Sequence, residues 1–371
     1  MTPTPTRRAC LHALTGLAAG ALSSLALPAQ ATALADALAL PARAARRPAH
    51  SVQLALASAG PRLVAVGERG VILLSDDAGQ AWRQAKSVPV SVTLTAVHFV
   101  SAKVGFAAGH SGVLLQSQDG GETWARRLQG QEAAALVLQA AQALPASDTQ
   151  PRALAAAQRL ADDGPDKPWL ALHFSDAQHG LLLGAYNLAL QTADGGATWQ
   201  ALSPRLDNPQ SLHLYAAASQ GPAWLLAGEQ GLLLQSRDGG ASFERLASPY
   251  KGSFFTSQPL PDGEWLVAGL RGNVWRSSQA GRSWTQLRGL PPVNITVSAR
   301  LANGRVALVN QAGMGFVTDT QGQALQPLPL PPGPPLADLL ALPDGALVSA
   351  GFAGVHRLDL PTSPTLTRPV R

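Results

Sequence analysis

Short apolar runs separated by glycine-containing turns recur along most of the chain. The run Leu63–Val66 precedes the turn Gly67–Gly70, and the run Val71–Leu74 follows it. Short runs rich in Val, Leu and Ala between turn residues are typical of strands joined in hairpins. A further apolar stretch, such as Leu94–Phe99, stands in front of a hairpin. The pattern therefore predicts repeated units of short antiparallel strands.

Five of these hairpins are followed by an acidic turn that ends in an aromatic residue, most fully written as Ser117-Gln-Asp-Gly-Gly-Glu-Thr-Trp124. The aromatic residues of the five copies are Trp82, Trp124, Trp199, Phe243 and Trp284. Three of the four intervals between them are 41 to 44 residues and the other is 75. Blades of comparable propeller repeats are about 40–45 residues long. Continuing the shorter step beyond Trp284 adds two units, so the spacing predicts seven.

The hairpin turns themselves occur seven times, opening at Gly67, Gly109, Gly184, Gly228, Gly269, Asn310 and Gly351. Glycine and asparagine tolerate the left-handed backbone angles that tight hairpin turns need. With a strand before each hairpin and another after each acidic turn, every unit has four strands, which make one blade. The repeats therefore predict an all-β fold, a seven-bladed β-propeller over residues 51–371.

The long interval contains a segment of different character. Residues Glu132–Leu144 are almost entirely Ala, Leu, Val and Gln, and Pro151 stands where a second helix would begin, with Asp148 or Thr149 as its cap and Gly164 at its end. The segment predicts a helical hairpin over residues 131–163, inserted between blades 2 and 3.

Residues 1–33 have the pattern of an export signal. Arg7 and Arg8 precede the apolar stretch 11–27, and Ala-x-Ala cleavage patterns follow over residues 29–33. The segment predicts export by a twin-arginine or a general secretory route, and hence a periplasmic protein.

Composition narrows the function classes. Residues 34–50, rich in Ala, Pro and Arg, predict a flexible lead, and no basic run follows it. Cys10, the only cysteine, lies within the export signal, so the exported chain is expected to have neither a disulfide nor a thiolate metal site. A net charge of +5 with 14% charged residues argues against nucleic-acid binding, and no later apolar stretch is long enough to span a membrane. We expect a monomer without cofactor or metal.

The acidic turns are interpreted as structural features of the repeat rather than as parts of a functional site. Their carboxylates can accept backbone N–H groups within the turn, and their aromatic rings can fill the space between blades. The aspartates are Asp77, Asp119, Asp194 and Asp238, with the five aromatic residues given above. Because Gln279 and Thr320 replace this aspartate in two units, each carboxylate is expected to contribute only a local hydrogen bond.

The predicted binding site lies on the opposite face. In a propeller, the turns between second and third strands share a face with the connections between blades, and the helical insertion falls in such a connection. Polar and aromatic side chains from separate blades would converge there around a central opening. They are Glu68, Arg69, His110, Tyr186, Asn187, Glu229, Gln230, Arg271, Gln311 and Phe352.

Two histidines are weighed as metal ligands. His98 and His173 each stand eleven residues before their turn glycine, so they occupy equivalent places in blades 2 and 3. No third ligand has a matching position, and a zinc site needs at least three protein ligands. Histidines packed within strands are the favoured interpretation, and no metal site is predicted.

These repeats resemble the Asp-box, or bacterial neuraminidase, repeat. Together with the Gly-x-x-Gly turns they are similar to the photosystem II stability and assembly factor family, in its bacterial exported branch. The resemblance covers about residues 51–360 and is carried most clearly by Ser91–Gln118, Tyr250–Phe255 and Leu260–Asn273. It implies a non-enzymatic propeller scaffold that binds a membrane-protein client or an envelope complex. The helical insertion and the presence of only two turn arginines, Arg69 and Arg271, depart from that family.

Two other functions remain open. Sialidases also carry Asp-box repeats, and their chemistry needs clustered arginines, a Tyr nucleophile with a Glu partner, and an acid/base Asp. Tyr186 near Glu68 or Glu229 is the one such constellation available, so an enzyme is not favoured. A propeller that binds a small ligand is the other alternative. Ring closure is also open, since Thr365–Val370 and residues 34–45 compete for the outer strand of the last blade.

Overall fold

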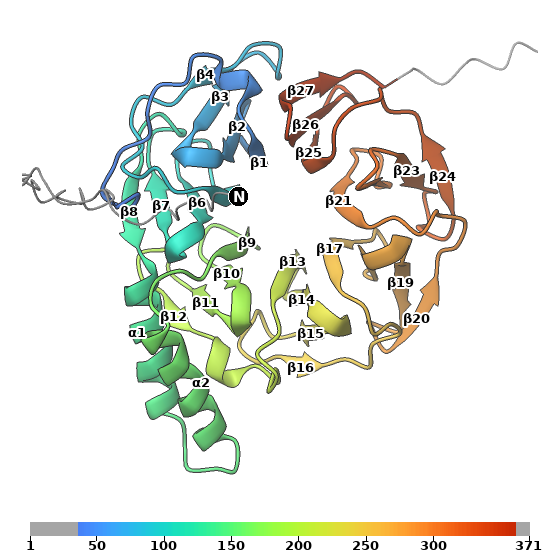
Figure 1. The fold of residues 1–371 in the computed structure, drawn as a ribbon. Helices are drawn as coiled ribbons and strands as arrows, with labels where there is room; N and C mark the ends of the chain where they lie inside the picture. The colour runs from blue at the N-terminus through green and yellow to red at the C-terminus, as the bar shows by residue number, and fades with distance from the viewer. Residues whose placement is uncertain (1–35, 361–371) are drawn as a thin grey trace, which may run out of the picture. The chain divides into compact units, whose positions relative to one another are not determined.

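The computed structural model describes residues 36–360. Seven antiparallel sheets follow one another along the chain; six have four strands and the last has three. The innermost strands of successive sheets touch from β1 through β25, and β25 touches β1, so the sheets close into a ring (Figure 1). The predicted seven-bladed β-propeller is confirmed.

The strands of blades 1 to 3 are β1 (Gln53–Ala59), β2 (Arg62–Gly67), β3 (Ile72–Ser75) and β4 (Arg83–Gln84); β5 (Leu94–Phe99), β6 (Gly105–Gly109), β7 (Leu114–Ser117) and β8 (Ala125–Leu128); β9 (Trp169–Phe174), β10 (Gly180–Gly184), β11 (Ala189–Thr192) and β12 (Gln200–Ala201). Those of blades 4 and 5 are β13 (Leu214–Gln220), β14 (Ala223–Gly228), β15 (Leu233–Ser236) and β16 (Glu244–Arg245); β17 (Phe254–Pro259), β18 (Trp265–Gly269), β19 (Val274–Ser278) and β20 (Ser283–Gln286). Those of blades 6 and 7 are β21 (Ile295–Arg300), β22 (Val306–Asn310), β23 (Gly315–Thr318) and β24 (Leu325–Leu328); β25 (Leu336–Ala341), β26 (Leu347–Gly351) and β27 (Gly354–Leu358).

The helical hairpin lies between β8 and β9, as predicted, and consists of α1 (Gly130–Gln142) and α2 (Gln150–Asp162). At its start the Gln129 N–H donates to Glu132 Oε2 at 3.0 Å. Val137 of α1 and Leu160 of α2 are buried in one hydrophobic core with side chains of blades 2 and 3. The hairpin is therefore packed onto the ring at its rim (Figure 1).

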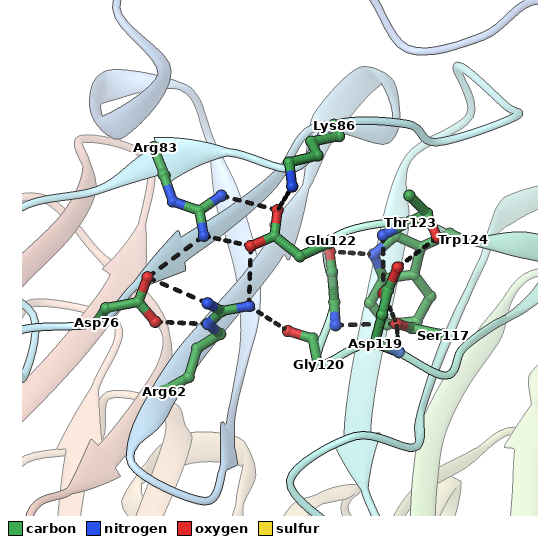
Figure 2. Close-up of polar contacts among 11 residues, drawn as sticks. Arg62, Asp76, Arg83, Lys86, Ser117, Asp119, Gly120, Glu122, Thr123 and Trp124 are labelled. Atoms are coloured by element: carbon green, nitrogen blue, oxygen red, sulfur yellow. Dashed lines mark hydrogen bonds and ion pairs between the residues drawn. The ribbon is translucent and has the colours of Figure 1, made fainter.

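The acidic turns are closed by short polar contacts, shown for blade 2 in Figure 2. Asp119 Oδ1 accepts the Thr123 N–H at 2.9 Å, while the Ser117 hydroxyl accepts the Gly121 N–H at 2.8 Å. The Trp124 indole N–H donates to the Gly121 carbonyl at 2.9 Å. Hydrogen bonds from Thr123 and Ser117 lower the pKa of Asp119 against the opposing effect of burial. The carboxylate thus holds the turn in its ionised form.

An ion-pair cluster joins the same turn to blade 1 (Figure 2). Glu122 lies 2.5 Å from Arg83 Nη2, 3.1 Å from Arg62 Nη1 and 3.6 Å from Lys86 Nζ. Asp76 completes the cluster with Arg62 and Arg83. The bond from Arg83 is the main reason that the pKa of Glu122 is lowered. These contacts join blades 1 and 2 on the face that carries the acidic turns.

The part of the lead that the structure describes runs along blades 1 and 2. The Ala42 N–H donates to the Val88 carbonyl at 3.0 Å, and the Ser91 N–H to the Ala37 carbonyl at 2.8 Å. The predicted export signal and the predicted strand Thr365–Val370 lie outside the described residues. Among the helices that are described, none is long and apolar enough to cross a membrane.

Candidate binding face

The hairpin turns and the helical insertion occupy one face, here called the insertion-bearing face. The turns have a common backbone, with the residue at the tip in the left-handed region at φ between 52° and 57° in five blades. These tip residues are Arg69, Ser111, Tyr186, Gln230 and Arg271. Since five different side chains adopt the conformation, it belongs to the repeat rather than to any one site.

Turn residues predicted for binding are hydrogen-bonded to the connections between blades. The backbone N–H of Tyr186 donates to His213 Nδ1 at 2.8 Å, and that of Arg271 donates to Asn294 Oδ1 at 2.9 Å, so both turns are tied to the following blade. Glu229 Oε2 accepts the His213 N–H at 3.2 Å, which ties the turn of blade 4 to the connection that leads into the same blade. The repeat pattern does not predict these contacts, because the partners lie in the connections, outside the repeated motifs.

A groove of about 530 Å³ opens between α2 and the connection from blade 3 to blade 4. It brings Tyr186 and Asn187 together with the insertion, whereas the other predicted binding residues lie outside it. Its remaining walls are Val137, Asp148, Thr149, Arg152, Ala153, Ala156, Ala157 and Leu160 of the hairpin, and Ser203–Pro209 with Ser211 of the connection. The floor is therefore aliphatic, and charges of both signs stand around it.

Residues 203–211 were not predicted as part of the site. The segment is held by Asn208, which is buried and donates from Nδ2 to Asn187 Oδ1 and to the Leu212 carbonyl, both at 2.9 Å. Asn187 in turn donates to the Ser203 carbonyl at 3.1 Å. Two linked asparagines thus fix the wall that faces the hairpin.

A chain of aromatic rings runs from the groove toward blade 5. Tyr186 meets His213 edge to face at 4.7 Å between ring centroids, His213 lies 6.0 Å from Tyr215, and Tyr215 lies 5.4 Å from Phe255. Lys167 Nζ stands 5.5 Å from the centre of the Tyr186 ring. Burial, with Glu229 nearby, raises the pKa of Tyr215, so its hydroxyl remains protonated as a donor.

Large apolar side chains are exposed mainly on this face. Within residues 36–360, five are exposed, and four of them belong to the insertion or to hairpin turns. Their exposed fractions are 36% for Leu154, 56% for Tyr186, 40% for Met314 and 64% for Phe352. Because isolated apolar residues are ordinary on a surface, their gathering on one face is the informative feature.

The two candidate ligand histidines are packed between blades. The His98 ring meets that of His173 at 5.4 Å and stacks on Phe174 at 5.5 Å, while His173 Nε2 lies 2.8 Å from the Ser219 hydroxyl. Burial lowers the pKa of His98 to about 3 and that of His173 to about 4. In the part of the chain that the structure describes, no three His, Cys, Asp or Glu side chains are grouped to hold a metal.

Comparison with known proteins agrees with the repeat pattern. Residues 164–326 match the model of a family described as photosynthesis system II assembly factor YCF48. A photosystem II assembly lipoprotein Ycf48 from Prochlorococcus marinus is 37% identical over 170 residues. The resemblance to the photosystem II stability and assembly factor family is confirmed. That alignment covers 45% of this chain and 49% of the relative, so the match spans about half the length of each.

Solved structures share the fold at lower identity. A structure titled YCF48 bound to D1 peptide is 16% identical with a TM-score of 0.61, covering 85% of this chain and 95% of that one. YCF48 from Cyanidioschyzon merolae is 14% identical with a TM-score of 0.60, covering 85% and 97%. The WD40 propeller of Doa1 reaches a TM-score of 0.61 at 11% identity, covering 88% and 97%. Similarity to assembly factors and to a WD40 domain at these identities establishes the propeller fold alone.

Proposed function

We propose that this chain is a non-enzymatic accessory factor of the cell envelope, which holds a segment of a membrane-protein client against its insertion-bearing face. The export signal predicted for residues 1–33 would place it in the periplasm. The resemblance to assembly factors supports the scaffold role, and one propeller of that family carries a D1 peptide in its solved structure. Photosystem clients are one case of the broader class that we propose.

The groove beside α2 is the observation that carries this proposal. It combines an aliphatic floor with polar rims, and its volume of about 530 Å³ lies in the range of sites that enclose small molecules or short peptide segments. Exposed Tyr186 at one edge, with Ala153 and Ala156 of α2 also in the lining, offers an apolar anchor of the kind that dominates binding energy in interfaces. The insertion, which no other blade connection within residues 36–360 contains, supplies one whole wall.

A sialidase-type enzyme finds less support. Within the described residues, no hydrogen bond joins the Tyr186 hydroxyl to a carboxylate, and Glu68 and Glu229 instead accept the backbone N–H groups of Val52 and His213. A nucleophilic tyrosine needs such a carboxylate partner.

Crosslinking capture from the envelope fraction of the host tests the proposal. The bait chain is compared with a double variant of the groove lining, Ala153→Asp with Tyr186→Ser. Serine is tolerated at the left-handed turn tip because Ser111 occupies the equivalent place in blade 2. We expect the native chain to capture a membrane protein and the double variant to capture at least tenfold less, the loss that about 1.4 kcal/mol of binding energy produces.

Leu154→Asp is the matched control, since Leu154 is exposed on the same helix but does not line the groove. Equal capture by the native chain and by the groove variant would remove the groove from the proposal. Capture of no protein, together with retention of a small molecule or cleavage of a sialoside, would replace the scaffold function by one of the two alternatives.

A further inference from the structure

We propose that the other side of the insertion-bearing face, across blades 5 to 7, docks on the surface of an anionic phospholipid membrane. The segments concerned, here called the cationic sector, are the hairpin turns and blade connections on this face. They are residues 246–253, 269–273, 287–294, 310–314, 329–335 and 351–354. The inference goes beyond client binding and concerns residues that do not line the groove.

The cationic sector carries positive charge without compensation. Its segments include Lys251, Arg271 and Arg288 and contain no Asp or Glu. All three side chains are exposed. Among the ion pairs and side-chain hydrogen bonds within residues 36–360, none involves the charged group of these three residues. The side chains are therefore available to an external anionic partner.

The opposite face of the same blades carries charges of both signs, because Arg282 and Arg300 are accompanied there by acidic residues such as Asp262, Asp319 and Asp344. There Arg276 pairs with Asp262, and Arg357 pairs with Asp344 at 2.7 Å and with Asp359 at 3.0 Å. Both arginines stand on a third strand, and their partners lie in neighbouring turns. Within blades 5 to 7, positive charge without accompanying acidic residues is therefore found on the side that also bears the insertion.

Exposed apolar side chains lie on blades 6 and 7, next to the blade that these cations surround. Phe352 and Met314 project from the turns of blades 7 and 6, and both are exposed. A groove of about 370 Å³ between these turns is lined by the proline-rich segment 330–335. Aromatic and aliphatic side chains beside Lys and Arg are the composition found where proteins meet the headgroup region of a bilayer.

A membrane fits this combination better than a protein does. The three cations surround blade 5, and the exposed apolar turn tips stand on blades 6 and 7 of the same face, so the partner must be anionic and must also accept apolar side chains across three neighbouring blades. A bilayer containing anionic lipid has both properties, and each Lys or Arg near such a surface strengthens binding about fivefold. The partner inferred is therefore the lipid surface beside the client rather than the client itself.

Vesicle co-sedimentation of the processed chain tests this inference. The probes are phosphatidylcholine vesicles and vesicles of phosphatidylcholine mixed with phosphatidylglycerol. We expect binding to the mixed vesicles, loss of that binding at high salt, and a decrease of at least about tenfold in Arg271→Glu with Arg288→Glu. Phe352→Ser is expected to weaken binding by roughly fivefold through loss of apolar insertion.

Arg282→Glu with Arg300→Glu is the matched control, because both arginines are exposed on the opposite face and change the net charge by the same amount. Equal loss in this control, equal binding to both kinds of vesicle, or no binding to either would overturn the inference. The groove variant, Ala153→Asp with Tyr186→Ser, should still bind the mixed vesicles. Failure of client capture and failure of membrane docking are therefore separate results.

Discussion

Asp338 is the residue whose environment is least expected from the repeat. It lies on β25, the last innermost strand, and its Oδ2 accepts the Leu56 N–H of blade 1 at 2.7 Å. The Leu339 N–H donates to Oδ1 at 2.8 Å. The carboxyl group thus crosses the seam where the ring closes. Burial outweighs these hydrogen bonds and raises the pKa of Asp338 to about 6.

Replacing Asp338 by Asn should stabilise the ring at neutral pH. A carboxyl group with a pKa raised from 3.8 to about 6 favours the folded state below pH 4, and this contribution is lost as the pH rises through 6. Asparagine has one acceptor oxygen, so it keeps the bond from the Leu56 N–H and loses the one from the Leu339 N–H, but it also removes the buried charge. We therefore expect a net gain of about 1–2 kcal/mol at pH 8 that vanishes near pH 4. Urea unfolding at several pH values measures it. A gain that is constant with pH would show that Asp338 titrates normally.

The acidic turn of blade 5 lacks the usual aspartate, and a carboxylate from another position in the blade takes its place. Gln279 stands where aspartate is found elsewhere, but Glu264, just before β18, accepts the Ser277 hydroxyl at 2.5 Å and the Ala280 N–H at 3.1 Å. In blade 6 the neighbouring Asp319 accepts the Gln323 N–H at 2.7 Å. In both blades a carboxylate at another position therefore supplies hydrogen bonds to the turn.

Glu264→Gln should cost more stability than Gln279→Ala. The glutamine side chain has one acceptor oxygen, so either the Ser277 hydroxyl or the Ala280 N–H loses its partner, at a cost of about 1 kcal/mol. Gln279 receives only a long contact of 3.4 Å from the Ser283 hydroxyl, so its removal should be nearly neutral. Chemical denaturation of the two variants compares them directly. Equal costs would mean that the turn does not depend on Glu264.

Repeats of fixed length made the elements predictable. The turn glycines and the acidic turns recur in the chain order of the blades, and the Ala-rich segment contrasts with the strands on either side of it, so strands, turns and insertion all followed from local pattern. Glu264 and Asn208 did not, because each reaches its partners through strand register or a blade connection. Only Glu264 had a weak local signal, namely a carboxylate placed beside the turn that had lost its own.

The helical insertion is an integral part of the propeller, because it shares a hydrophobic core with two of the blades. Ala133 and Val137 of α1 and Ala157 and Leu160 of α2 share a core with blades 2 and 3. Client binding through this hairpin would therefore act on a rigid wall, which lowers the conformational entropy lost on binding. It also follows that deleting the hairpin is a poor test of function, since the deletion exposes the core of the blades.

Thermal unfolding of three variants distinguishes a structural hairpin from a dispensable one. Leu160→Ala should lose about 2–3 kcal/mol because it leaves a cavity in the shared core, whereas Leu154→Ala, at an exposed position of the same helix, should change stability by less than about 0.5 kcal/mol. Replacing residues 131–163 with a short Gly/Ser linker should lower the unfolding temperature further than Leu160→Ala does. An unchanged unfolding temperature in the linker variant would mean that the ring folds independently of the hairpin. In that case the groove would have one movable wall, and client capture would depend on the hairpin closing over the bound segment.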